Sequence, residues 1–420
     1  MPSSPSTKAP AAFVCGCEEW MRPACKGLSF FKEKEGKRYC VLHYPGEEKS
    51  TAFRGILQRK LDAQDFKFHG VWFPDKAEFR NFTFKTDAYF FNTTFSKGAA
   101  FNHATFSGRA HFTHATFNGT ASFFAVSFNV DAHFGQATFT AKADFKHATF
   151  DALAVFYYTT FSAGASFEFA TFKDYVIFVG SDRKKVFDDN SSLNLQFARV
   201  EKPDRLSFHT LRLRHHWFVN VDARKFEFIN VNWDWVHVSI NQEIQSIDER
   251  DVLSSHRLLA IACRNLAVNA EENHRYEEAS RFRYMAMEAR RLERWRGFVP
   301  WRLSWWYWLA SGYGERVWRA FVVLIGVWLL AAAVYTQVGF VRWEPRVSSE
   351  QEAAQAKRDE VGAPLPLTRA LTYSLGVMTL QKPEPRPATD AAQAVVMSET
   401  ILGPVQAALL ALAIRRKFMR

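Results

Sequence analysis

Four of the five cysteines in this chain lie close together near its start, and a histidine follows the last of them. These residues are Cys15, Cys17, Cys25, Cys40 and His43. Structural zinc ions take four thiolate or imidazole ligands in a tetrahedron, and the C-x-x-H spacing lets a tight turn bring two ligands to one ion. We predict a structural zinc knuckle over residues 13–48, with Cys17, Cys25, Cys40 and His43 as ligands and Cys15 as the alternate.

The alternative interpretation of this segment is a loose cysteine-rich stretch with reactive thiols. Residues 1–14 lack the apolar core of a secretory signal, so we expect a disordered tail at 1–12 and a cytoplasmic amino-terminal region. In that reducing compartment cysteines are expected as metal ligands or free thiols rather than disulfides. Four protein ligands leave no open position on a metal, and the sequence shows no nucleophile–base pair and no phosphate loop. We therefore expect no enzymatic activity.

A periodic ladder of phenylalanines follows this segment in the sequence. From Phe73 to Phe178 the steps between ladder phenylalanines alternate between six and five residues, which gives an eleven-residue unit. The ladder comprises Phe73, Phe79, Phe84, Phe90, Phe95, Phe101, Phe106, Phe112, Phe117, Phe123, Phe128, Phe134, Phe139, Phe145, Phe150, Phe156, Phe161, Phe167, Phe172 and Phe178. A small residue, usually alanine, stands two positions before most of them. A unit this short cannot bury its own phenylalanine, so the units must stack as a solenoid.

The alternating unit A-x-F-x-x-A-T-F-x-x-x resembles the pentapeptide-repeat family. The resemblance implies a right-handed, four-sided β-helix over residues 67–180. We expect a linker helix at 49–66 before it and degenerate closing coils at 181–248 after it. Eleven residues for two faces give 22 residues for a four-sided coil, with the family's tight turns altered at two corners. Some members mimic DNA with an acidic surface, but acids and bases nearly balance along this solenoid, which disfavours mimicry.

Residues 249–297 have the apolar spacing of two helices with a break at Asn273-His274. The pair resembles one tetratricopeptide-type hairpin. A single hairpin is expected to couple domains, and a peptide-binding groove is the alternative interpretation.

The last part of the chain has the pattern of a membrane domain. The formal net charge is +11, and arginines crowd on both sides of long apolar stretches. The predicted elements are an aromatic interfacial helix at 298–316, transmembrane helices at 317–338 and 389–414, an external loop at 339–364, a re-entrant segment at 365–388 and a basic tail at 415–420. The positions of the arginines predict that both termini lie in the cytoplasm. We expect the membrane to be a cell membrane, and more specifically a bacterial inner membrane. Nucleic-acid binding is the rival interpretation, disfavoured because the basic clusters flank the spans.

The order of span, short helix, irregular segment and span resembles the two-span pore-loop channels of the potassium-channel type. The residues that carry the resemblance are Ala370–Leu380 and Glu399–Pro404, which contains a glycine where such inner helices often bend. Met378–Pro383 stand where those channels have Thr-Val-Gly-Tyr-Gly, so potassium selectivity is not implied. The pore-lining candidates are Thr379, Glu399, Gly403 and Gln406. An acid inside a span is costly, so the alternative is that Glu399 pairs within the bundle or lies near the interface.

We therefore expect a multidomain β + α protein of the membrane. Two spans and one pore loop cannot enclose a pore alone, which implies a homo-oligomer, taken as a tetramer. The expected function is an oligomeric ion-channel-like pore whose cytoplasmic β-helix acts as a sensor or scaffold for an unidentified protein partner. The alternative is a membrane-anchored interaction scaffold with a vestigial, non-conducting pore domain. Partners are the lipid bilayer and other proteins rather than nucleic acid.

Overall fold

A computed structural model describes residues 13–181, 185–188, 191–233, 239–248, 254–293, 303–341 and 364–418. The chain divides into two compact units, Met1–Asn269 and Ala270–Arg420. The predicted tail at 1–12 and most of the predicted external loop at 339–364 lie outside the described residues.

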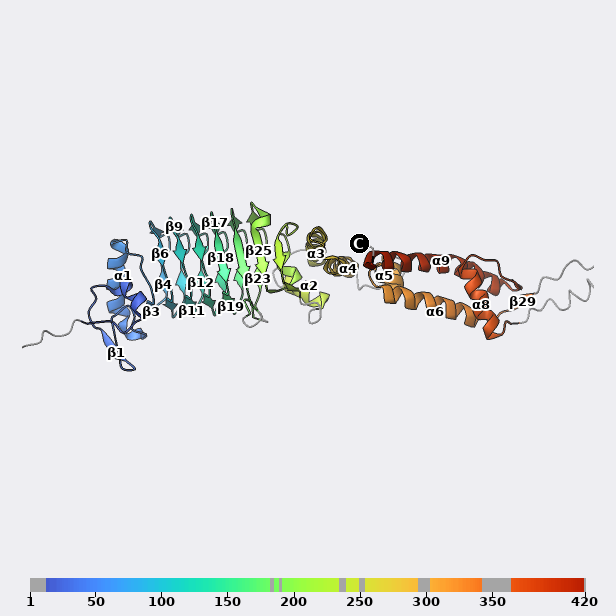
Figure 1. Ribbon diagram of the computed structural model, residues 1–420, viewed down its shortest axis with the longest axis horizontal. Coiled ribbons are helices and arrows are strands. Elements are labelled where there is room, and N and C mark those ends of the chain that lie inside the picture. The colour runs from blue at the N-terminus through green and yellow to red at the C-terminus, as the bar shows by residue number, and fades with distance from the viewer. Residues whose placement is uncertain are drawn as a thin grey trace, which may run out of the picture. The chain divides into compact units, whose positions relative to one another are not determined.

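The first unit contains a β-solenoid of about seven turns, in which short parallel strands stack into four sheets (Figure 1). The longest sheet holds β6 (Ala88–Tyr89), β10 (Ala110–His111), β14 (Ala132–His133), β18 (Ala154–Tyr157), β22 (Val176–Val179), β25 (Leu206–His209) and β27 (Glu227–Ile229). A second holds β3 (Trp72–Phe73), β7 (Thr94–Phe95), β11 (Thr116–Phe117), β15 (Thr138–Phe139) and β19 (Thr160–Phe161).

The other two sheets complete the four faces of the coil. One holds β4 (Ala77–Glu78), β8 (Ala99–Ala100), β12 (Ala121–Ser122), β16 (Ala143–Asp144), β20 (Ala165–Ser166) and β23 (Leu193–Asn194). The other holds β5 (Thr83–Phe84), β9 (Thr105–Phe106), β13 (Ser127–Phe128), β17 (Thr149–Phe150), β21 (Thr171–Phe172) and β24 (Arg199–Val200). Ala110 pairs with Ala132 across one turn, so the predicted coil of 22 residues (110 to 132) is confirmed.

The ladder phenylalanines form the core of the solenoid, and each is at most 1% exposed. Rings one turn apart lie face to face: the centroids of Phe84 and Phe106 are 4.5 Å apart, and those of Phe117 and Phe139 are 4.6 Å apart. Burying each ring contributes about 1.5–3 kcal/mol. Because the inward alanines are small, the walls close around the rings. The repeated burial explains why one residue type recurs so strictly.

The corners of the coil explain the alternation of six-residue and five-residue steps. Each five-residue step contains a residue with positive φ, such as His103 (φ 58°), His114 (φ 58°) and Gln136 (φ 57°). Asn and His tolerate this left-handed conformation better than branched residues do. The additional residue of each six-residue step therefore lies at the intervening corner.

Both ends of the solenoid are covered by other elements. At the start are η1 (Glu19–Cys25), β1 (Lys32–Lys34), β2 (Lys37–Tyr39), η2 (Glu47–Lys49) and α1 (Ser50–Asp62). Phe53 of α1 packs edge-on against Phe73 of the first coil, with centroids 5.2 Å apart. At the far end are η3 (Pro203–Arg205), β26 (Arg212–Leu213), η4 (His215–Phe218), β28 (Asn232–Trp233), α2 (Ile240–Asp248) and α3 (Ser255–Glu272). The side-chain nitrogen of Asn269 on α3 lies 2.6–3.1 Å from three carbonyl oxygens of the last coil, so α3 satisfies groups that the next coil would otherwise pair.

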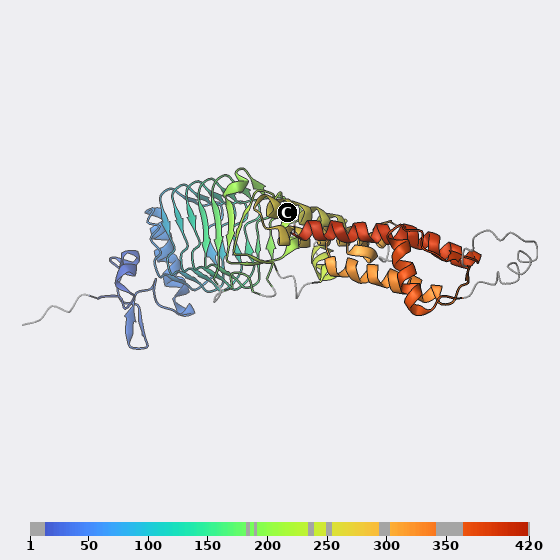
Figure 2. The ribbon, with the colours of Figure 1, turned by 45° about the vertical axis from the view of Figure 1, so that its right-hand side comes forward.

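The second unit is mainly helical. Its elements are α4 (Tyr276–Glu293), α5 (Leu303–Ser311), α6 (Val317–Tyr335), β29 (Phe340–Val341), α8 (Leu367–Met378), β30 (Arg386–Pro387) and α9 (Asp390–Phe418). Two of these helices, α6 and the Asp390–Arg416 part of α9, are long and apolar enough to cross a membrane. They lie side by side, and the short α8 packs against both (Figure 2).

Candidate metal centre and buried carboxylate

The amino-terminal segment brings thiol and imidazole groups together. The ligand atoms of Cys15, Cys17, Cys25 and His43 all lie within 4.8 Å of one another. Cys25 ends η1, and His43 follows Cys40 in a turn closed by a hydrogen bond from the Tyr44 N–H to the Cys40 carbonyl. These four residues could hold a metal ion. Their thiolate and imidazole donors suit zinc, which binds four such ligands in structural sites.

Cys40 lies at the edge of this cluster and brings the number of available donors to five. Its Sγ is 3.4 Å from Nδ1 of His43, and its backbone N–H donates to Sγ of Cys15 at 3.3 Å. Both Cys15 and Cys17 stand in the close group, although the sequence indicated that only one of them ligates. A tetrahedral ion takes four of the five donors. The choice among them stays a prediction.

The orientation of His43 favours metal binding through Nδ1. Its Nε2 lies 2.8 Å from the carbonyl oxygen of His69, so Nε2 carries the proton and donates it to that oxygen. The unprotonated Nδ1 then faces Sγ of Cys15 at 3.6 Å and Sγ of Cys40 at 3.4 Å. A backbone carbonyl that fixes the tautomer of a ligating histidine is a common feature of metal sites. This partner could not be predicted from the spacing of the ligands, because His69 belongs to the first coil.

A buried lysine lies beside the thiols. Lys49 is 0% exposed, and its Nζ donates to the Leu42 carbonyl at 2.7 Å. Burial lowers the pKa of Lys49 to about 7, and the negative charges of Cys40 and Cys15 act in the opposite direction. Three thiolates, one neutral histidine and a divalent ion sum to one negative charge, which a charged Lys49 would offset.

The second cluster of polar groups surrounds Glu399 of α9, which is only 2% exposed. The Tyr335 hydroxyl of α6 donates to its carboxylate at 2.5 Å, and the Ser374 hydroxyl of α8 donates to the other oxygen. The Ser374 oxygen also lies 3.1 Å from the Trp328 carbonyl, and Nε1 of Trp328 donates to the Leu371 carbonyl at 3.0 Å. One carboxylate therefore connects three helices and has partners for both of its oxygens.

Two other predicted pore-lining residues also face helices of their own chain. The buried Gln406 amide lies 2.8 Å from the carbonyl oxygens of Ala310 and Ala320. At Gly403 an added Cβ would lie 2.9 Å from the Met378 side chain, so glycine permits close packing of α8 on α9. Thr379 is exposed at the end of α8. Whether these residues and Glu399 also line a pore stays a prediction.

The turn between α5 and α6 joins the end of α9 to α4. Its residues Gly312, Tyr313 and Gly314 all have positive φ. Nη1 of Arg416 donates to the Tyr313 carbonyl at 3.0 Å and lies 3.4 Å from Glu315, whose carboxylate also accepts a hydrogen bond from Ser280 of α4. Residues of both α9 and α4 therefore bind this turn within the second unit.

The match to a known protein family lies within the phenylalanine ladder. Residues 101–149 match the family model for pentapeptide repeats (9 copies). This part of the chain is a pentapeptide-repeat solenoid. No curated protein and no solved structure matches the chain. The resemblance inferred from the ladder is thus confirmed there, and the assignment of the membrane domain rests on its own residues.

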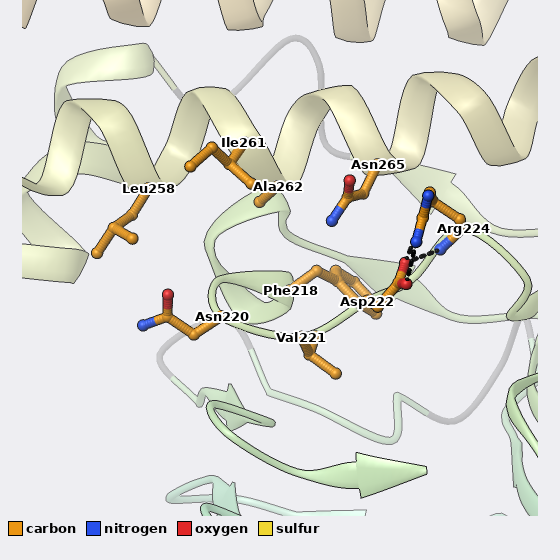
Figure 3. A pocket seen from close by; sticks show the side chains of 9 residues that line it. All are labelled: Phe218, Asn220, Val221, Asp222, Arg224, Leu258, Ile261, Ala262 and Asn265. Atoms are coloured by element: carbon orange, nitrogen blue, oxygen red, sulfur yellow. Dashed lines mark hydrogen bonds and ion pairs between the residues drawn. The ribbon is translucent and has the colours of Figure 1, made fainter. Parts of the chain in front are cut away.

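The pentapeptide-repeat solenoid carries a cavity where its last coils meet α3 (Figure 3). The cavity has a volume of about 260 Å³. Its polar lining consists of the amides of Asn220 and Asn265 and the Asp222–Arg224 ion pair, with Nη2 to Oδ2 at 2.6 Å. The lining side chains include no thiol, hydroxyl or imidazole, and Asp222 supplies the one carboxylate among them.

Proposed function

We propose that this protein is a subunit of an oligomeric, ion-channel-like membrane pore, with the pentapeptide-repeat solenoid as its cytoplasmic sensor or scaffold. The supporting observation is the attachment of α8 to both candidate spans through the buried Glu399. A helix of 12 residues is about 18 Å long, whereas the hydrocarbon core is about 30 Å thick. A helix of this length enters the bilayer and returns rather than crossing it.

The segment after α8 supports the same proposal. Residues 379–385 are irregular in the structure and lead to β30. Irregular backbone at membrane depth is tolerated only where it is buried in protein or lines a water-filled cavity. Thr379, Leu380 and Gln381 are exposed in the single chain. A ring of subunits, which we take as a tetramer, would place this exposed segment around a shared aqueous path.

In this proposal Glu399 holds α8 in place from inside each subunit. Its two donors, Tyr335 and Ser374, lie on different helices, so losing the carboxylate would loosen both attachments. If Glu399 instead lines the path, Glu399→Gln would change cation preference without loosening α8. Measuring selectivity and thermal stability together in that variant separates the two roles.

The second candidate is a membrane-anchored interaction scaffold whose pore segment does not conduct. Two observations favour it. Met378–Pro383 lack the Thr-Val-Gly-Tyr-Gly filter, and the polar groups of Glu399 and Gln406 are satisfied within the chain. In a scaffold, α8 would serve only to stabilise the pair of spans.

The remaining assignments follow the same proposal. Zinc is the proposed ion of the amino-terminal cluster, in a structural role because its four positions would be filled by protein. We propose no enzymatic activity, a bacterial inner membrane location with both termini in the cytoplasm, and protein rather than nucleic-acid partners for the solenoid. Flux from liposomes that contain the purified full-length chain tests the pore directly. Cation flux above that of empty liposomes supports the pore, whereas no flux under any voltage, pH or tension leaves the scaffold.

A further inference from the structure

Two arginines at the start of α6 have their guanidinium groups placed over aromatic rings. Arg316, the residue before the helix, lies with its guanidinium carbon 4.5 Å from the Tyr284 ring centroid. Arg319, in the first turn, lies 4.2 Å from the Trp308 ring centroid. The two arginines stand three residues apart in the sequence where α6 begins, and each guanidinium is oriented by a ring.

The charges of these two arginines are not neutralised within the described part of the chain. No carboxylate oxygen of the described residues lies within 4.0 Å of either guanidinium. The nearby acids have other partners: Glu288 pairs with Arg291, and Glu315 pairs with Arg416. A guanidinium stacked on a ring keeps its edge N–H groups available, and their planar fork matches a phosphate.

The surroundings are those of a membrane surface. Trp308 lies on the aromatic helix α5, and tryptophans concentrate at the headgroup level of bilayers. Trp318, between the two arginines in sequence, is 73% exposed and stacks on Phe321 with centroids 5.5 Å apart. These apolar rings would be costly to expose to water and suit contact with acyl chains.

We propose that Arg316 and Arg319 form a binding site for the phosphate of an anionic phospholipid headgroup. The inference rests on the proposed membrane location of α6, but it does not require that the protein conducts ions. Basic groups next to a span attract anionic lipids, and oriented donors add direct hydrogen bonds to the phosphate. We commit to a lipid rather than free phosphate because the exposed Trp318 and Phe321 adjoin the arginines.

The test measures bound lipid on the full-length chain by native mass spectrometry. The protein in detergent is incubated with an equal mixture of phosphatidylglycerol and phosphatidylcholine, and retained adducts are counted. We expect the wild type to prefer phosphatidylglycerol and Arg316→Gln/Arg319→Gln to lose that preference about tenfold. The control, Arg290→Gln/Arg415→Gln, removes the same charge from two exposed arginines and is expected to keep most of the preference.

Two further measurements distinguish binding of a lipid phosphate from a general effect of positive charge and from binding of free phosphate. Arg316→Lys/Arg319→Lys retains both charges without the planar fork, and a preference between those of the wild type and the Gln variant is expected. Adding excess inorganic phosphate to the wild type should leave the preference unchanged. The proposal is overturned if the control loses as much preference as the Gln variant, if the Lys variant matches the wild type, or if inorganic phosphate abolishes the preference. A protein that shows no flux can still pass this test, so failure here is distinct from failure of the pore.

Discussion

Tyr335 and Glu399, 64 positions apart in the chain, are joined by a hydrogen bond of 2.5 Å from the phenol to the carboxylate. Ser374 donates to the same carboxylate, so one buried carboxylate contacts α6, α8 and α9 beside a cluster of apolar side chains. Apolar packing alone would let α8 rotate or slide along its neighbours. The carboxylate, together with the hydrogen bond from Trp328 to the Leu371 carbonyl, holds α8 in the arrangement that the pore proposal requires.

The first prediction concerns this contact. Ser374→Ala removes a donor from the buried carboxylate, and a lost partner of this kind costs about 1–3 kcal/mol. We expect a lower thermal midpoint in detergent for Ser374→Ala. Ser398→Ala is the matched control, because the exposed Ser398 hydroxyl donates to the Ala394 carbonyl of its own helix, at 2.8 Å. Equal midpoints for the two variants would show that the Glu399 contact does not hold α8.

The second prediction concerns the metal cluster. The purified chain should contain about one zinc ion, and Cys25→Ser should remove it. Lys49→Met, which keeps the length of the side chain, should let a chelator extract the metal at lower concentration because a cation beside the thiolates is lost. Lys37→Met, on the exposed β2, should behave as the wild type. Metal analysis and chelator titration check both points, and a metal-free chain with an intact fold would contradict the assignment.

The third prediction tests the phenylalanine core. Phe123 stacks between Phe101 and Phe145, with centroids 5.0 and 4.7 Å away, and is 0% exposed. Phe123→Ala should destabilise the solenoid by about 3–5 kcal/mol. Phe169 stacks on Phe197 but is 46% exposed and has φ 56°, so Phe169→Ala should cost far less. Chemical unfolding followed by circular dichroism measures both, and similar losses would contradict the assignment of Phe123 to the core.

Much of the solenoid could be predicted from the sequence because its information is local and repeated. The step between ladder phenylalanines defines the 22-residue coil that pairs Ala110 with Ala132, and hydropathy identifies the stretches that become α6 and α9. The partners of the sites could not be predicted. The His69 carbonyl that orients His43 comes from the first coil, and a polar stripe on α9 does not reveal that Glu399 faces Tyr335 of its own chain.

The fourth prediction concerns pH. His111 and His133 stack on adjacent turns with centroids 5.1 Å apart, and burial lowers the pKa of both. The unfolded chain, with an ordinary value near 6.5, then binds protons more readily than the folded one. The stabilisation is present above about pH 6.5 and is lost as the pH falls.

The amides of β10 and β14 should therefore be less protected from hydrogen exchange at pH 5 than at pH 7, after each rate is corrected for the intrinsic exchange rate at that pH. His133→Tyr should remove much of that acid sensitivity, because Tyr89 already occupies an equivalent position in the same stack, with its ring 5.1 Å from His111. His114→Asn, at an exposed corner, should leave it unchanged. Acid sensitivity that persists in His133→Tyr would assign the effect to other groups.

The most direct test of the central claim is cation flux through the full-length chain in liposomes, compared with empty liposomes and with Ser374→Ala. We expect flux in the wild type and reduced flux in Ser374→Ala, because loosening α8 displaces the segment at Thr379–Gln381. An absence of flux under any voltage, pH or tension, from protein that is folded and inserted, would contradict the pore and leave a membrane-anchored scaffold.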